Sequence, residues 1–364
     1  MKKLIAIMLA ATMVLSMTAC GAPAEQAPAA EAPAAAPAAE APAAEAPAAP
    51  AAEAPSADPA VKLVYAEVNP DTSLMGQVAT FFKQKVEELS GGSVTVDVQY
   101  SAVLGAEGDV LEAMTGGAGT IDVARISPGS LTSYEGVKLT SLISCPYILN
   151  GREHFWKFAD SEIGQKILAE PSELGLGIHG MFYVEEGFRN FFFANEIKGL
   201  SDLAGKKIRV STDAVMTGMV EGLGANPTVV AFNELYTSLS SGVVDGAEQP
   251  IANYQSNAFY EVAPYMILDN HTLGCGEVII LDSTWDKLTD NQKAALTEAG
   301  KAASAYCKEI SEAAENACKE ELEAKGVTFI PVENKQEWKD ACAGIIAQVT
   351  AGIEDSYEAI NALA

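Results

Sequence analysis

Apolar and polar residues alternate along the chain in a pattern that predicts short strands separated by amphipathic helices. Residues 61–66 and 94–100 have the two-residue period of half-buried strands, and an apolar stripe at helical spacing covers 73–89 between them. The second half repeats the pattern, with a strand expected at 207–210 and a helix at 214–223. This alternation predicts an α/β fold in which parallel sheets are covered by helices.

The repetition of strand, helix and strand in both halves predicts two lobes, with the second beginning near Gly187. Two short strands are expected around this boundary, at 177–182 and 190–194.

A long amphipathic helix is predicted to begin at Thr289. Residues 289–292 have the form of a capping box, small apolar residues and Tyr306 then recur every three or four positions, and Gly326 is a natural stop. About 36 residues would make a helix roughly 54 Å long. This exceeds the width of one lobe, so we expect the helix to cross both. A coiled-coil partner helix is the alternative, but the stripe is rich in alanine and the flanking segments are strand-like.

The N-terminal segment has the features of a secretory signal. Lys2 and Lys3 precede an apolar run over 4–14 that is too short to span a membrane comfortably. The following Met17-Thr18-Ala19-Cys20-Gly21 resembles a bacterial lipobox. Residues 1–20 are therefore predicted to be a lipoprotein signal peptide, whose removal leaves Cys20 lipidated and attached to the membrane. An ordinary cleavage site beside a coincidental cysteine is the alternative.

Residues 21–60 consist almost entirely of Ala, Pro and Glu, with repeated Glu-Ala-Pro-Ala-Ala units. Because this segment lacks large apolar side chains, burial cannot offset the entropy lost on ordering it. Frequent proline favours extended conformations. We therefore expect a disordered linker that holds the folded part away from the membrane.

The charge balance narrows the range of partners. The chain has 364 residues, with 49 acidic and 23 basic side chains and a formal net charge of −26. Nucleic acids and anionic lipid surfaces are bound by basic surfaces, so neither is an expected partner. A small anionic ligand is not excluded, because one or two well-placed arginines could bind it.

No pattern in the sequence indicates catalysis, a metal or another cofactor. His154, His179 and His271 lack metal-binding spacing, and the sequence has no phosphate-binding loop or nucleophile elbow. The five cysteines beyond the lipobox are odd in number and are expected to be mostly buried apolar side chains. A disulfide between Cys318 and Cys342 is left open.

One arginine occupies a position that suits ligand binding. Arg209 lies near the end of the predicted strand 207–210, with Ile208 and Val210 on either side. An arginine in such apolar surroundings must be paired or must meet a ligand. Its planar guanidinium suits two-point recognition of a carboxylate. An ion pair between the two lobes is the alternative interpretation.

A series of segments resembles the solute-binding subunits of TRAP (tripartite ATP-independent periplasmic) transporters, the DctP family. The similarity runs from about Val61 to the C-terminus, and the order and spacing of the second-lobe segments make it specific. The segments that carry the resemblance are 103–105, 119–122, 145–149, 187–189, 203–210, 223–227, 232–239, 242–250, 270–271 and 285–288.

The resemblance implies a two-lobed, periplasmic-binding-protein-like α/β fold that closes on its ligand. Residues 61–186 with about 275–314 would form lobe I, and residues 187–274 with about 315–364 would form lobe II. The long C-terminal helix would cross both lobes. A monomer without a cofactor is expected.

The resemblance also implies roles for residues of the second lobe. Arg209 matches the arginine that clamps the substrate carboxylate, and Arg189 matches a second, less uniform contact. Phe232 would line the pocket beside the ligand. Gln249 stands where the family usually has an asparagine that fixes the geometry of the carboxylate and the arginine. His271 is a weaker candidate, for which a histidine in a capped loop is the alternative.

Contacts from the first lobe follow two predicted strands. Glu67 and Asn69 come after the first strand, and Arg125 and Ser127 after the strand that contains Asp122. The carboxyl ends of strands are where α/β proteins usually bind ligands. We prefer Glu67 and Ser127, because Glu67 could accept hydrogen bonds from a hydroxylated ligand. Simple surface exposure explains each of these residues equally well.

These observations predict an extracytoplasmic receptor that binds a small organic acid by its carboxylate and delivers it to the TRAP membrane permease. The acid could be a sugar acid, a dicarboxylate or a keto acid. A receptor of an ATP-driven importer is one alternative. The alternative from another class is an extracytoplasmic enzyme that uses Cys275 near His271.

Overall fold

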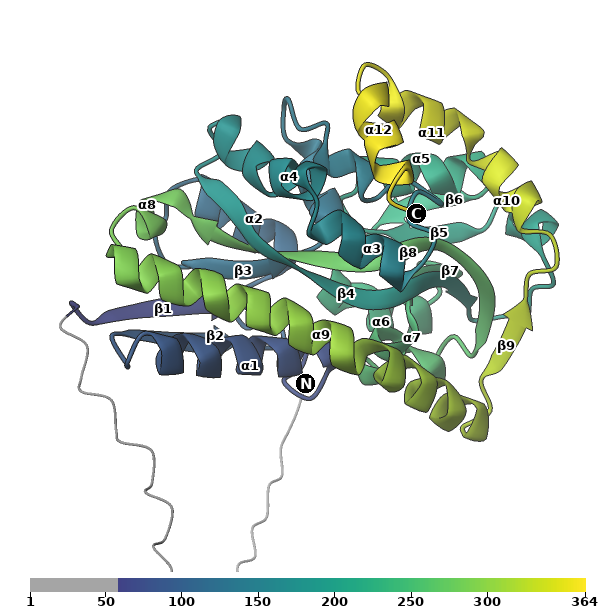
Figure 1. Cartoon of the computed structure of the whole chain (residues 1–364). Coiled ribbons are helices and arrows are strands. Elements are labelled where there is room, and N and C mark those ends of the chain that lie inside the picture. Colours follow the sequence, from purple (N-terminus) through teal and green to yellow (C-terminus); the bar gives the residue numbers. More distant parts are fainter. Residues whose placement is uncertain (1–57) are drawn as a thin grey trace, which may run out of the picture. The chain divides into compact units, whose positions relative to one another are not determined.

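The computed structural model describes residues 58–364. The predicted signal peptide, Cys20 and almost all of the linker lie outside these residues. The described residues form a mixed α/β structure around one nine-stranded sheet with the order β2-β1-β3-β8-β4-β7-β5-β6, and β9 pairs with β8 (Figure 1). The strands are β1 (Val61–Ala66), β2 (Val94–Gln99), β3 (Val123–Ile126), β4 (Ile178–Phe193), β5 (Lys207–Val210), β6 (Asn226–Val229), β7 (Gly246–Pro250), β8 (Tyr265–Leu281) and β9 (Thr328–Pro331).

Helices cover the sheet, and those predicted at 73–89, at 214–223 and from Thr289 are confirmed. Ser73, for example, caps the first helix by accepting a hydrogen bond from the backbone of Gly76. The α-helices are α1 (Leu74–Leu89), α2 (Glu107–Thr115), α3 (Arg152–Ala159), α4 (Glu162–Glu173), α5 (Ala214–Gly222), α6 (Leu235–Ser240), α7 (Ile251–Ser256), α8 (Asp282–Trp285), α9 (Asp290–Ala324), α10 (Lys335–Ala341), α11 (Ala343–Thr350) and α12 (Glu354–Asn361).

The sheet is mixed, so the prediction of parallel sheets is wrong in this respect. On one side β1 runs parallel to β2 and β3, and on the other side β5 runs parallel to β6 and β7. Between these two groups, β4 and β8 pair with each other in antiparallel orientation along most of their length. These two long strands connect the halves of the sheet (Figure 1).

Both connecting strands are longer than predicted. β4 is continuous over 16 residues where the sequence predicts two short strands, and the 17 residues of β8 are not predicted. The pairing of β4 with β8 shifts between Glu185 and Gly187 and again between Arg189 and Phe191. Gly187 has a φ of 93°, which glycine adopts without strain. Irregularities of this kind let a strand continue while turning its side chains toward new neighbours.

Each half of the sheet buries apolar side chains on both faces. Along β8, Val278 and Ile280 belong to a core with α1, α4 and α9, whereas Ile279 and Leu281 belong to a core with α2. The second half has two further cores, one with α5 and α11 and one with α6 and α7. The sheet is therefore the middle of three layers, as the alternation of strands and helices predicts.

The long helix α9 confirms the prediction made from its capping box and alanine stripe. It has 35 residues, and Thr289 and Gln292 exchange the two hydrogen bonds of a capping box. In the first half α9 packs along α1, where the rings of Phe81 and Tyr306 stack with centroids 4.4 Å apart. In the second half it packs on α7 (Figure 1). The helix therefore contacts elements of both halves.

The C-terminal helices also contact both halves. α11 packs on α5, where Ile345 fits against Gly218. α12 packs on α4, and the Nε2 atom of His154 lies 2.7 Å from the carbonyl oxygen of Ile360. The last helix therefore lies beside the first half of the sheet, although the sequence assigns all of 315–364 to the second lobe.

All five cysteines of the described residues are free thiols, so Cys318 and Cys342 form no disulfide. Four of the five are buried and Cys318 is partly exposed, as expected for small apolar side chains. Within residues 58–364, no helix combines the length and the apolar character needed to cross a bilayer.

One buried carboxyl group lacks any partner among its neighbours. Glu277 of β8 is fully buried, and within residues 58–364 neither of its carboxyl oxygens has a hydrogen-bond partner. Burial, together with the nearby charge of Glu170, raises the pKa of Glu277 from 4.5 to about 8. Between these two pH values the unfolded chain releases a proton that the folded chain keeps. Rising pH therefore favours unfolding across this window.

We predict that Glu277→Gln raises the free energy of unfolding by a few kcal/mol at pH 8 and changes it little at pH 4.5. Glutamine keeps the shape of the side chain and never ionises. The difference in the free energy of unfolding should therefore grow with rising pH, because the parent protein becomes less stable. Urea unfolding of both proteins at the two pH values measures the difference. A gain of the same size at both values would contradict this account.

Candidate functional site

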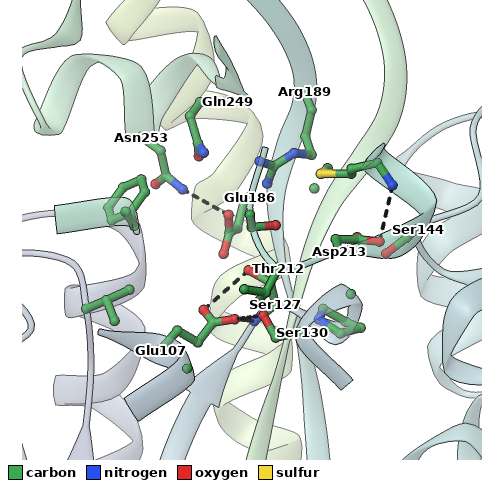
Figure 2. A pocket seen from close by; sticks show the side chains of 18 of the residues that line it. Glu107, Ser127, Ser130, Ser144, Glu186, Arg189, Thr212, Asp213, Gln249 and Asn253 are labelled. Carbon is green, nitrogen blue, oxygen red and sulfur yellow. Dashed lines mark hydrogen bonds between the residues drawn. The ribbon is translucent and has the colours of Figure 1, made fainter. Parts of the chain in front are cut away.

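A cavity of about 230 Å³ lies where strands from both halves of the sheet end. Its walls are formed by the segments that follow β1, β3, β5 and β6, and residues of β4, β7 and β8 complete it. Figure 2 shows some of the lining side chains. Parallel strands converge at their carboxyl ends, which is where α/β proteins usually bind ligands. Both halves therefore contribute to one candidate site.

Three of the four arginines of the chain line this cavity: Arg125, Arg189 and Arg209. The fourth, Arg152, pairs with Glu185 and Glu315 instead. In a chain with 49 acidic and 23 basic residues, guanidinium groups are thus concentrated at one site, and their ability to bind an anion depends on the carboxylates around each of them.

Arg209 reaches the cavity because of its place on β5. Its neighbours Ile208 and Val210 point into the core with α5, so the arginine points to the opposite face of the strand. Its Nε donates a 2.8 Å hydrogen bond to the carbonyl oxygen of Val230, and its Cζ lies 5.9 Å from the centre of the Phe232 ring. Among the described residues, no carboxylate lies within 4.0 Å of its guanidinium.

Burial makes this positive charge unfavourable in the empty cavity. The Arg209 side chain is only 3% exposed, and burial lowers the pKa of Arg209 to about 10 because the charge of Glu248 compensates only in part. A ligand carboxylate would pair with the guanidinium in surroundings that screen charge poorly, where such a pair is strongest. The site is therefore built to gain from an anionic ligand.

Arg189, in contrast, already has an anionic partner. Its Nε and Nη2 both contact the carboxylate of Glu248, with 2.7 Å between Nη2 and Oε1. Two further side chains continue this series of charged contacts. The Nε2 atom of His271 lies 3.5 Å from Glu248, and its Nδ1 atom lies 2.6 Å from Asp269. Although burial opposes it, Asp269 and Glu248 together raise the pKa of His271 to about 9, so the ring is protonated at neutral pH. This chain of charges fixes the orientation of Arg189.

Arg125 is also paired, at the opposite side of the site. Its Nη2 lies 3.0 Å from Glu186, its Nε 3.6 Å from Glu67 and its Nη1 4.0 Å from Glu107. Glu67 in turn accepts hydrogen bonds of 2.8 and 2.9 Å from the backbone and side chain of Asn69. Among the three arginines of the cavity, Arg209 is therefore the one whose charge the described carboxylates leave without a partner.

The structure brings five of the seven predicted contact residues to the cavity wall. These are Arg189, Arg209, Ser127, Phe232 and Gln249. Glu67 and His271 are not part of this cavity wall, and their contact with a ligand stays a prediction. Glu67 lies beside Arg125, and His271 lies beside Glu248, which binds Arg189. Each therefore supports an arginine of the wall.

Several acidic and hydroxyl side chains of the wall were not predicted from the sequence. Glu107 accepts hydrogen bonds from Ser127 and Ser130, and Glu186 accepts one of 2.9 Å from Asn253. Burial raises the pKa of Glu107. The unpredicted residues that Figure 2 labels are Glu107, Ser130, Ser144, Glu186, Thr212, Asp213 and Asn253.

Two of these acids do leave a signal in the sequence. Glu107 begins α2 and Asp213 caps α5, and each helix is the element that follows a strand in the sequence. A carboxylate at the start of a helix is ordinarily explained by capping alone. The sequence therefore offers no separate reason to assign these two residues to a binding site.

The chain is similar to a known family of proteins over most of its length. Residues 65–352 match the family described as bacterial extracellular solute-binding protein, family 7, or DctP. A solute-binding protein of Roseobacter denitrificans is 30% identical to this chain over 282 residues, which cover 78% of this chain and 85% of that protein.

Solved structures with bound acids have the same fold. A TRAP periplasmic solute-binding protein from a Bradyrhizobium species, in complex with D-galacturonate, is 28% identical, has a TM-score of 0.78 and aligns over 83% of this chain and 99% of its own. A second, from Sulfurospirillum deleyianum with bound succinate, is 28% identical, has a TM-score of 0.76 and aligns over 84% of this chain and 100% of its own.

We predict that Arg209→Met raises the melting temperature of the ligand-free protein by a few degrees. Methionine fills similar space without a buried charge, so the substitution removes the desolvation cost that lowers the pKa of the guanidinium. Differential scanning calorimetry on protein stripped of ligand measures the change.

Arg152→Met is the matched control, because it removes the arginine that pairs with Glu185 and Glu315. It should lower the melting temperature, since buried Glu185 would lose its cation. If Arg209→Met lowered the melting temperature as well, Arg209 would be a structural cation and not a ligand-binding one.

Proposed function

The chain belongs to the bacterial extracellular solute-binding proteins, family 7, the DctP family of TRAP transporter subunits, and from this we propose that its cavity binds a sugar acid through Arg209. Proteins of this family capture an organic acid outside the cytoplasm and deliver it to the membrane permease. The ligand class and the contacts described below are the proposal.

One observation carries the proposal. Arg209 is buried in the cavity wall, its guanidinium is anchored by a hydrogen bond to Val230, and no described carboxylate neutralises it. A fixed and uncompensated guanidinium needs no rearrangement before it binds a carboxylate, so little of the binding energy is lost in ordering it. Phe232 would cover one side of the pair.

The remaining wall supports a hydroxylated acid over a plain dicarboxylate. Arg189 and Arg125 already have carboxylate partners, so neither is free to neutralise a second acid group fully. The other wall groups are acids, amides and hydroxyls, which exchange hydrogen bonds with sugar hydroxyls. The relatives include one solved with D-galacturonate and one with succinate, and the wall of this chain is better matched to the first.

The position of the cavity suits a receptor that closes on its ligand. Wall residues come from both halves of the sheet, so a bound acid would hold the two halves together. Closure of this kind would distinguish the loaded from the empty form when the protein meets its permease. The family match favours a TRAP permease over the ATP-driven importer that the sequence alone leaves open.

An enzymatic role using Cys275 has little chemical support. Cys275 lines the cavity, but burial raises the pKa of its thiol far above the usual range. A thiol of this kind is mostly un-ionised, and the thiolate is the reactive form. Its relatives are solute-binding proteins, and we propose that this chain binds its ligand without changing it.

We further propose that the mature protein is anchored through Cys20. The apolar run and the lipobox-like segment 17–21 support removal of residues 1–19 and lipidation of the new N-terminal cysteine. The segment 21–60, rich in Ala, Pro and Glu, would then span the distance between the membrane and the folded part.

We predict that Arg209→Met weakens the binding of D-galacturonate at least about 100-fold, because it removes one partner of a buried charge pair. Isothermal titration calorimetry measures the affinity. Lys207→Ala is the matched control, since it removes a positive charge from an exposed position of the same strand. It should leave the affinity within about twofold. Equal affinities for Arg209→Met and the parent would contradict the assigned role.

We predict that Cys20→Ser abolishes the incorporation of labelled palmitate when the full chain is expressed in a bacterial host that processes lipoproteins. The protein should then leave the membrane fraction, because serine offers no thiol for lipidation. Cys318→Ser, which changes a partly exposed cysteine of the folded part, should remain labelled. Labelling that persists in Cys20→Ser would exclude this anchor.

A further inference from the structure

We propose that Asp213 determines which class of acid the cavity accepts, by reserving its side of the cavity for a hydroxyl group and excluding a second carboxylate. This inference rests on the proposed function, because it assumes that one carboxylate of the ligand pairs with Arg209. It goes further in assigning the choice between monocarboxylates and dicarboxylates to one residue.

Asp213 is a buried carboxylate held in the cavity wall. It is 4% exposed and lies at the N-cap of α5, where one oxygen accepts hydrogen bonds of 2.8 and 3.2 Å from the backbone of Val215 and Met216. Ser144, from the first half of the chain, lies beside the carboxylate in the cavity wall and lowers its pKa (Figure 2). Burial raises the pKa of Asp213, while Ser144, the two backbone donors and the more distant charge of Arg189 favour its ionised form.

The other strongly buried acids at the site have arginine partners, and Asp213 does not. Glu186 lies 3.0 Å from Arg125, and Glu248 is bound by Arg189. Among the described residues, no lysine, arginine or histidine nitrogen lies within 4.0 Å of the Asp213 carboxylate. Among the described residues that line the cavity, Arg209 is therefore a buried cation and Asp213 a buried anion without an ion-pair partner within 4.0 Å.

The packing around Asp213 prevents the carboxylate from turning away from the cavity. A methyl group added to Gly129 would lie only 1.8 Å from Asp213 Oδ2, so the carboxylate rests directly on the glycine backbone. The next residue, Ala214, donates its backbone N–H to Thr132 Oγ1 at 3.2 Å. Gly129 and Thr132 belong to the 3₁₀ helix η1 (Pro128–Ser133) of the first half, so both halves hold Asp213 in place.

A ligand that satisfies both Arg209 and Asp213 carries a different chemical group for each of them. Its carboxylate pairs with Arg209, and a hydroxyl at another position donates a hydrogen bond to Asp213. A ligand with carboxylates at both positions would place like charges together in surroundings that screen them poorly. A uronic acid meets this requirement, whereas the corresponding aldaric acid, oxidised to a carboxylate at both ends, does not.

The experiment compares D-galacturonate with galactarate, which carries a second carboxylate on the same six-carbon skeleton, by calorimetric titration of the parent and of Asp213→Asn. Asparagine keeps the size of the side chain and its capping oxygen, so α5 remains capped. We expect the ratio of the galactarate affinity to the galacturonate affinity to rise at least about tenfold, since the like charge is removed.

Two further variants make the result decisive. Asp213→Ser, which also caps a helix but lacks the carboxylate, should raise the same ratio. Asp286→Asn removes an exposed acid outside the cavity wall and should leave the ratio unchanged. An unchanged ratio in both Asp213 variants would overturn the inference, and so would an equal rise in Asp286→Asn. Failure of the parent to bind either acid would overturn the proposed ligand class itself, which is a different outcome.

Discussion

The binding site depends on the positive charge of Arg209, which is buried in the protein even when no ligand is bound. On its strand, Arg209 lies between two fully buried residues. Its guanidinium contacts the carbonyl oxygen of Val230 and the ring of Phe232, and the described residues provide no counter-ion for it. Leaving a guanidinium in this state lowers the stability of the empty protein. The same state gives a carboxylate ligand its largest gain, because the cost of removing the arginine from water is already met on folding.

The other charges of the site are arranged so that Arg209 stays uncompensated. Arg189 holds Glu248, whose second neighbour is His271, and Arg125 is surrounded by three glutamates. The carboxylates of Glu67, Glu107, Glu186 and Glu248 are thereby paired with arginines other than Arg209. The two long strands β4 and β8 carry much of this network, which explains why polar residues occupy the middle of the sheet.

Because the wall of the cavity comes from both halves of the sheet, ligand binding and the arrangement of the halves are linked. The segment around Gly129 and Ser144 meets the start of α5 at Asp213, and α9 contacts helices on both sides. A ligand acid bound between Arg209 and the first half of the sheet would add a further contact between the two halves. A receptor can in this way convert the presence of a small anion into a change of shape that a membrane partner recognises.

The sequence by itself determined the local elements and singled out Arg209, which lies in the cavity wall. Periodicity and capping residues predicted β1, α1 and α9 to within a residue or two, and the motif around Arg209 identified the arginine. It could not predict that β4 is continuous or that β8 exists, because their polar residues resemble loops until partners distant in sequence neutralise them. Only the tertiary structure placed Glu67 beside Arg125 and His271 beside Glu248, and brought Asp213 to the cavity. Which charges pair depends on distances between strands, and the order of residues along the chain does not contain those distances.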